Sequence, residues 1–314
     1  MERGHDDVEK AGTGVALVVA GAALFGTLGI FGELARAAEL STATLLAARF
    51  LAASAILWAY LARRGVPIRL GRRTLAAELG LGFVYGLMSI TYFESLAWLS
   101  AGIATLVLFT YPVQVTLASA LALDEPVTVP KALALCAALG GVALVAGGGT
   151  ALGLPGLVLV GVASLAYTVY SVGSRVAVET VSPLVHAAYV FLGVTVAVLL
   201  YGVGTGTLST PATPAHWRLI AGITVVGTLL PMLLFTAGLA RIPASTASIV
   251  STSEPLTTVV LGVALLDEPF TPAVAAGGAA ILASVVLASP AVERAVTDRL
   301  RRVGPRRTEA PADD

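Results

Sequence analysis

Leu123-Asp124-Glu125-Pro126 and Leu266-Asp267-Glu268-Pro269 are two copies of one tetrapeptide, 143 residues apart. Residues 96–144 match the residues 143 positions later at 16 of 49 positions without a gap. A composition this biased would give about five matches by chance, so the chain contains an internal repeat. The same shift aligns further identical residues, among them Pro112 with Pro255, Thr128 with Thr271 and Ala132 with Ala275.

The composition indicates a membrane protein. Of 314 residues, 57% are hydrophobic and 12% are charged, and the mean hydropathy is +0.89. A soluble chain carries about 25% charged residues, so this chain is predicted to be an all-α membrane protein that binds no nucleic acid. Because a spanning helix needs ~20 mostly apolar residues, we predict ten spans, at 13–33, 43–63, 74–98, 101–122, 129–147, 153–174, 182–204, 217–240, 243–265 and 272–290.

The repeat divides these spans into two groups of five. We predict a first repeat at 1–148, a second at 149–290 and a basic tail at 291–314. Since five is odd, the second copy must enter the membrane from the opposite side. Such inverted repeats are typical of alternating-access transporters, which bind their substrate between the halves near the middle of the membrane.

The positions of the basic residues predict the orientation. Lysine and arginine are enriched on the cytoplasmic side of membrane proteins. With ten spans and both termini cytoplasmic, sixteen of the nineteen Lys and Arg residues fall on that side. Of the others, Arg36 and Arg218 fall outside and Arg49 falls within a span. We therefore expect a multi-pass cell-membrane protein with both ends in the cytoplasm.

Three charged residues lie well inside the predicted spans: Arg49, Glu94 and Glu254. A charge there costs about 2.5–3.5 kcal/mol, so each needs a partner or water. One interpretation is an ion pair between Arg49 and Glu94 that joins two helices. The functional interpretation is that Arg49 binds a carboxylate or phosphate, whereas Glu254 attracts an ammonium group or carries a proton. Glu78 falls at a span end, where solvent or headgroups are expected to reach it.

Hydroxyl and aromatic residues recur at helical spacing along several spans, and normally face the bundle interior. A serine or threonine often bonds only its own helix, which is the simpler interpretation for each one alone. Prolines near mid-span predict kinks, and glycines four residues apart predict close helix contacts. Besides the three charged residues, the predicted site residues are Tyr92, Tyr111, Tyr167, Thr168 and Ser251, with Tyr170 and Trp98 as further aromatic surface. The predicted kinks are at Pro112, Pro231 and Pro255, and the glycine pair is Gly82 and Gly86.

Two five-span halves, each with a proline in its fourth span and a Leu-Asp-Glu-Pro turn after it, resemble the EamA family of the drug/metabolite transporter superfamily. The resemblance covers nearly the whole chain. It implies a basket of ten helices around a central cavity that moves metabolites, amino acids or drugs inward or outward. The typical turn of the family reads Leu-Gly-Glu, and here Asp124 and Asp267 replace the glycine.

Other functions find little support in the sequence. Cys136 is the single cysteine, and the three histidines lie far apart, so we expect neither disulfides nor a metal site. No His-Glu-x-x-His pair, Gly-x-Ser-x-Gly elbow or Walker-type loop occurs. We therefore predict a secondary transporter without a cofactor that binds a small-molecule substrate, contacts the lipid bilayer and is a monomer or weak homodimer. Proton coupling is an option, and a non-transporting scaffold or receptor and an intramembrane enzyme are the alternatives.

Overall fold

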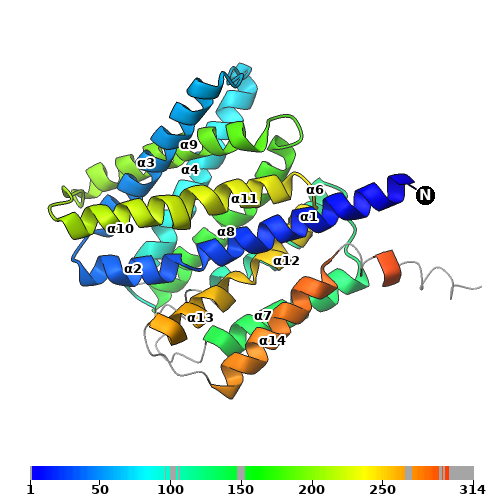
Figure 1. Ribbon diagram of the computed structural model, residues 1–314. Helices are drawn as coiled ribbons and strands as arrows, with labels where there is room; N and C mark the ends of the chain where they lie inside the picture. Colours follow the sequence, from blue (N-terminus) through cyan, green and yellow to red (C-terminus); the bar gives the residue numbers. More distant parts are fainter. Residues whose placement is uncertain are drawn as a thin grey trace, which may run out of the picture.

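The chain is helical throughout the part that the computed structural model describes, namely residues 2–95, 97–99, 104, 107–146, 153–265, 271–289, 292 and 294–296 (Figure 1). The second Leu-Asp-Glu-Pro copy and the arginines from Arg299 to Arg307 lie outside these residues. The helices are α1 (Glu2–Phe25), α2 (Leu28–Ala37), α3 (Thr42–Arg64), α4 (Arg72–Ser95), α6 (Tyr111–Ala122), α7 (Val129–Ala146), α8 (Leu154–Ala177), α9 (Pro183–Thr205), α10 (Pro214–Thr224), the π-helical η1 (Val225–Leu229), α11 (Leu230–Leu239), α12 (Ala244–Ser251), α13 (Glu254–Leu265) and α14 (Pro272–Leu287).

Several helices are long and apolar enough to cross a membrane. Within the described residues there are six such stretches, and each lies on a predicted span; Val129–Leu144 and Pro272–Leu287 are shorter apolar helices on two further spans. The prediction of a helical membrane protein is therefore confirmed, whereas the count of ten spans stays a prediction. The six stretches are Lys10–Gly32, Thr42–Arg64, Arg72–Ser95, Leu154–Ala177, Pro183–Thr205 and Pro214–Leu239.

The helix boundaries follow the repeat found in the sequence. Helices α6 and α13 each contain 12 residues and begin at positions related by the 143-residue shift. Both carry a proline as their second residue. At that position in a helix a backbone N–H has no intrahelical acceptor, so the missing N–H of proline costs no hydrogen bond. Helices α7 and α14 begin at positions related by the same shift.

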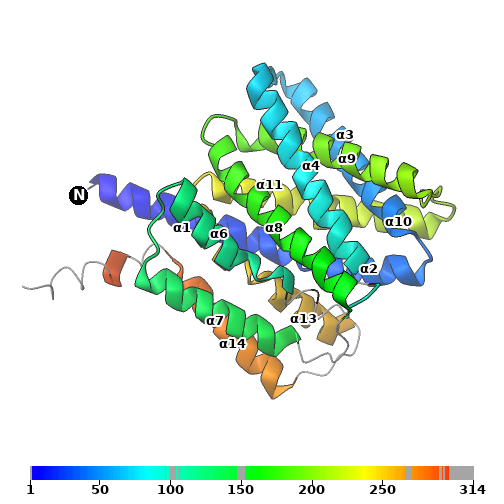
Figure 2. The ribbon, with the colours of Figure 1, turned by 180° about the vertical axis from the view of Figure 1, so that it is seen from behind.

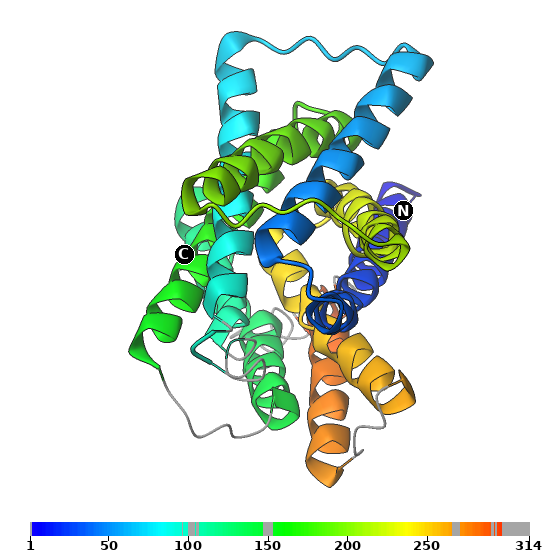
Figure 3. The ribbon, with the colours of Figure 1, turned by 90° about the vertical axis from the view of Figure 1, so that its left-hand side faces the viewer.

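The two halves interleave. Helix α4 packs against α8 and α9 of the second half, α1 packs against α11, and α7 packs against α14. Figures 1 and 2 show α3, α4 and α9 at one edge of the bundle and the α7–α14 pair at the opposite edge. Helix α9 packs against both α3 and α4, which are joined by a long connection (Figure 3). The interior is therefore built jointly by both halves.

Glycine allows the backbones of α4 and α9 to touch. A Cβ atom on Gly82 would lie 2.3 Å from the carbonyl oxygen of Val190, and one on Gly193 would lie 2.5 Å from that of Leu79. One turn further along α4, a Cβ on Gly86 would lie 2.7 Å from the side chain of Ala197. The close approach predicted for Gly82 and Gly86 is confirmed, and it locks a first-half helix to a second-half helix.

The prolines act differently from the predicted kinks within continuous helices. At Pro112 and Pro255 new helices begin, and the expected helix at 243–265 is broken after Ser251. The cause is that proline has no backbone N–H with which to continue the hydrogen-bond ladder of a preceding helix. Pro231 instead follows a π-helical segment, in which Thr228 Oγ1 donates to the carbonyl of Ile223 at 2.8 Å. The side chain thus satisfies part of the disturbed backbone.

Candidate functional site

Five helices bring a cationic, an acidic and three phenolic side chains together in the bundle. We call Arg49, Tyr85, Tyr111, Tyr167 and Glu254 the central cluster; they lie on α3, α4, α6, α8 and α13, respectively. Sequence reasoning selected four of them as site residues, and the structure adds Tyr85. The cluster combines residues of both halves.

Arg49 is buried, and no anionic partner lies against it in the described part of the chain. Its side chain is 3% exposed, and neither Nε nor Nη1 has a hydrogen-bond partner among the described residues. The guanidinium lies 4.4 Å from the ring centroid of Phe50 and 5.8 Å from that of Phe93. These rings stabilise the cation through their faces, but they leave N–H donors open. An unpaired buried guanidinium is well suited to bind a carboxylate or phosphate.

The tyrosines form a continuous aromatic surface beside Arg49. The Tyr111 and Tyr167 rings meet edge to face with centroids 4.5 Å apart, and Tyr85 lies 6.2 Å from Tyr167. Tyr170 on α8 extends the surface, with its ring 4.7 Å from Tyr85. The Tyr111 hydroxyl donates to the carbonyl of Ser248 at 3.3 Å, which fixes that ring against α12. Such a surface can hold an apolar or aromatic group.

Glu254 supplies the carboxyl group of the cluster. It is the first residue of α13 and is partly exposed, although Pro255 beside it is buried. The carboxyl group lies close enough to Tyr85, Tyr111 and Tyr167 to interact with their hydroxyls electrostatically. No hydrogen bond or ion pair holds it among the described residues. A carboxyl group in this position can accept an ammonium group or a proton.

The proposed Arg49–Glu94 ion pair is wrong. Glu94 accepts a hydrogen bond of 2.5 Å from the hydroxyl of Tyr201 on α9, whereas Arg49 lies over Phe50 and Phe93. The physical reason is the interleaved packing, because α9 lies against both α3 and α4 and brings Tyr201 to the carboxylate of Glu94. Glu94 thereby becomes a link between α4 and α9, outside the central cluster.

Thr168 belongs to a polar network between α6 and α8. Its hydroxyl donates to Oε1 of Gln114 at 3.1 Å, while Nε2 of Gln114 donates to Ser164 Oγ at 2.9 Å. The Ser164 and Thr110 hydroxyls lie 3.2 Å apart in the same network. Gln114 was missed by sequence reasoning, although it is a lone amide within a predicted span. The network joins the helices that carry Tyr111 and Tyr167.

Of the remaining predicted site residues, Ser251 lies at the central cluster. Its hydroxyl donates to the carbonyl of Ala247 in its own helix at 2.9 Å and lies within hydrogen-bonding reach of Tyr111. Tyr92 packs with the small apolar cluster that contains Leu99 and Val160. Trp98 is 55% exposed and does not join the aromatic surface around Tyr85.

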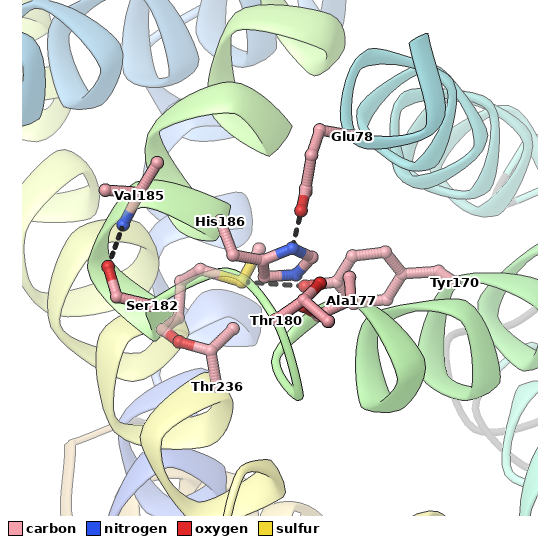
Figure 4. Close-up of polar contacts among 9 residues, drawn as sticks. Glu78, Tyr170, Ala177, Thr180, Ser182, Val185, His186 and Thr236 are labelled. Carbon is pink, nitrogen blue, oxygen red and sulfur yellow. Dashed lines mark hydrogen bonds and ion pairs between the residues drawn. The ribbon is translucent and has the colours of Figure 1, made fainter. Parts of the chain in front are cut away.

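Glu78 and His186 form a contact that sequence reasoning missed. Glu78 was expected to reach solvent or headgroups, but it is 1% exposed, and its Oε2 lies 2.6 Å from Nδ1 of His186, which is 0% exposed (Figure 4). The burial results from the tight packing of α4 on α8 and α9. No signal in the sequence pairs two positions 108 residues apart on different helices.

The first Leu-Asp-Glu-Pro turn connects the two halves. Both carboxylate oxygens of Glu125 accept bonds from the first turn of α12: from the backbone N–H of Ala244 at 2.9 Å, and from the N–H and hydroxyl of Ser245. A carboxylate at a helix N-terminus satisfies free N–H groups and interacts favourably with the helix dipole. The turn therefore fixes the start of α12 relative to the first half.

The described residues contain no group of three or more His, Cys, Asp or Glu side chains that could hold a metal ion. Comparisons with known proteins agree with the repeat. The model of the EamA-like transporter family matches the chain twice, over residues 12–147 and 154–289. A protein of known crystal structure is similar in fold with a TM-score of 0.78, at 20% identity over 91% of this chain and 99% of its own. No curated protein sequence matches the chain.

Proposed function

Because the chain belongs to the EamA-like transporter family, we propose that it is a secondary transporter that moves a small organic metabolite across the cell membrane by alternating access. It is a multi-pass membrane protein. The proposed architecture has ten spans in two inverted five-helix repeats around a central cavity, with both termini in the cytoplasm. The substrate is an amino acid or a drug-like compound.

The observation that carries the proposal is the open guanidinium of Arg49 beside the aromatic surface of the central cluster. A buried charge is retained in a membrane helix at a cost, and function is the usual reason for it. Arg49 binds a carboxylate or phosphate of the substrate, while Tyr85, Tyr111 and Tyr167 contact its apolar part. Glu254 accepts an ammonium group of the substrate or exchanges a proton.

Residues outside the cluster take supporting roles. Thr168 positions α8 against α6 through Gln114, and the helix starts at Pro112 and Pro255 provide matched breaks at which the two halves can change their tilt. The π-helical segment before Pro231 is a third such position. These breaks are the proposed hinges of alternating access.

Proteoliposomes test the proposal. The purified protein is reconstituted, and uptake and efflux of a panel of labelled amino acids and amphiphilic carboxylates are measured. We expect flux of at least one compound, loss of that flux in Arg49→Met, and unchanged flux in Arg64→Met, a matched control at the exposed end of the same helix. Absence of flux for every compound class would contradict a transport function.

Proton coupling is measured in the same vesicles with a pH gradient. We expect that Glu254→Gln folds and loses the effect of the gradient on flux. A variant that keeps the wild-type pH dependence would exclude Glu254 from proton transfer.

A further inference from the structure

A second buried polar site lies outside the central cluster, at Glu78 of α4 and His186 of α9. The 2.6 Å separation of Oε2 and Nδ1 is that of a short, charge-assisted hydrogen bond, and both residues lie within apolar helices (Figure 4). A proton must lie between the two atoms, because two lone pairs at this distance repel each other. A neutral imidazole can supply it from Nδ1, and Nε2 or the carboxyl group can hold one further proton.

The other polar atoms of the pair are left open. Oε1 of Glu78 and Nε2 of His186 are both buried and have no hydrogen-bond partner among the described residues. A pair that only joined two helices would be most stable with these atoms satisfied. The neighbouring glycine crossing already holds α4 against α9. The open atoms instead give a proton or a water molecule two places to bind.

Few charged groups face the pair from the helices packed around it. From α8, Tyr170 stacks on the imidazole with centroids 6.5 Å apart, and its hydroxyl donates to Sδ of Met232 on α11 at 3.0 Å. Arg175 of α8 is paired with Glu179 at 2.8 Å. The rest of α11 at this level presents the uncharged Thr236 (Figure 4).

The helices α3, α4 and α9 add no charge beside the pair in the described residues. Tyr189 of α9 donates its hydroxyl to the carbonyl of Ile68. The arginines of these helix ends are exposed, namely Arg63 and Arg64 on α3 and Arg72 and Arg73 on α4. The charge at the pair is thus set by the number of protons that the pair itself holds.

The pair lies one helical turn from the crossing of the two halves. Glu78 precedes Gly82 by four residues, and His186 precedes Val190 by four residues, where the backbones touch. A tilt of α4 about this fixed contact moves Glu78 relative to His186 while the crossing stays closed. Since α4 and α9 belong to different matched halves, such a tilt is part of any movement of one half relative to the other.

We propose that Glu78 and His186 form a proton-binding site within the membrane that opens and closes with the tilt of α4 against α9. In the closed state the pair holds one proton more than a carboxylate and a neutral imidazole, and this additional proton cancels the charge of the carboxylate. When the helices part and water enters, that proton passes to water and leaves a carboxylate and a neutral imidazole. Uptake of one proton from water restores the starting state.

Aromatic contacts connect this site with the central cluster. The imidazole stacks on Tyr170, the Tyr170 ring contacts Tyr85, and Tyr85 interacts electrostatically with Arg49. A ligand that displaces the ring of Tyr85 therefore acts on the side chain that packs against His186. The use of the proton in transport rests on the proposed function, whereas proton binding does not.

Nitrogen NMR of the full-length protein in nanodiscs tests proton binding directly. The chain has three histidines, so ¹⁵N-histidine labelling gives few signals, and His5→Gln and His216→Gln assign those of His186 by elimination. We expect the nitrogen shifts of His186 to change when the pair gains or loses a proton as the pH of the sample is varied. Nitrogen shifts that stay constant as the pH is varied would overturn the proposal without the need for any site variant.

Two matched carboxylate variants identify the partner. Glu78→Gln preserves the size of the side chain and removes its charge, so the pH dependence of the His186 nitrogen shifts is expected to change. Glu179→Gln changes an exposed carboxylate and is expected to leave this pH dependence as it is. An unchanged pH dependence in Glu78→Gln would show that the imidazole titrates without the carboxylate, against the proposed shared site.

Flux measurements separate this site from the proposed function. In proteoliposomes with an amino acid that shows flux, the pH gradient is expected to drive wild-type transport and to have no effect in Glu78→Gln. Equal responses of both proteins would refute a role of the pair in transport. If no compound moves at all, the proposed function fails, while the titration of His186 still decides whether the proton site exists.

Discussion

Replacement of Arg49 by methionine tests two effects of this residue separately, namely its effect on the free energy of unfolding and its role in transport. Methionine fills a similar volume with an apolar chain and leaves no donor unpaired. An arginine near the middle of a spanning helix costs about 2.5–3.5 kcal/mol, and the contact with Phe50, at 4.4 Å from the ring centroid, returns about 2 kcal/mol when desolvated. We therefore expect Arg49→Met to raise the free energy of unfolding by about 1 kcal/mol.

The assay is reversible unfolding in mixed micelles, with flux measured in parallel. Arg64→Met on the same helix is the control, and we expect a change within about 0.5 kcal/mol for this exposed position. A loss of about 3–5 kcal/mol in Arg49→Met would refute the reasoning, because that is the cost of breaking a buried ion pair. Normal flux in a stable Arg49→Met protein would refute the role of the guanidinium in binding.

Three further predictions concern the contacts between the halves. Gly82→Ala is expected to lower the free energy of unfolding by about 1–3 kcal/mol, because its Cβ would clash with the α9 backbone. The control is Gly80→Ala, whose Cβ would lie in open space and which is expected to cause no loss of stability. Equal losses of stability in the two variants would contradict the close crossing. Glu125→Ala is expected to lose about 1–2 kcal/mol through the uncapped α12, measured by the same unfolding assay; unchanged stability would show that the cap is not used. Cysteines placed at Glu125 and Glu268, in a chain lacking the native cysteine, are expected to react with an impermeant maleimide from opposite sides of the membrane, whereas reaction from one side would exclude inverted repeats.

Local sequence patterns were sufficient to predict the helices. Apolar runs of about 20 residues have to be helical in a membrane, since no other open structure satisfies the backbone there. The long helices accordingly lie on predicted spans, and the repeat anticipates that α6 and α13 begin at related positions. The same patterns did not reveal the helix starts at Pro112 and Pro255, because the hydropathy of the chain does not change where one helix ends and the next begins.

The site was predicted only in part, because its residues meet through packing between the halves. Burial of Arg49 followed from its position inside an apolar span. The partners of Glu94 and Glu78 did not, since Tyr201 and His186 lie on a helix of the second half whose position no local pattern reveals. Arg49 and Glu94 were paired because both were expected in the outer part of the membrane, but depth alone does not fix which side chains meet.

The interleaved packing of the halves has an evolutionary consequence. The main surfaces of α4, α1 and α7 are all covered by helices of the other half, so a lone five-helix unit would leave them bare. Before a duplication joined the two copies in one gene, the ancestral polypeptide would therefore have needed a second copy of itself to cover these surfaces. Fusion then freed each copy to diverge, which explains how one member of a formerly symmetric pair of positions can carry tyrosine at 111 while the other carries the glutamate at 254.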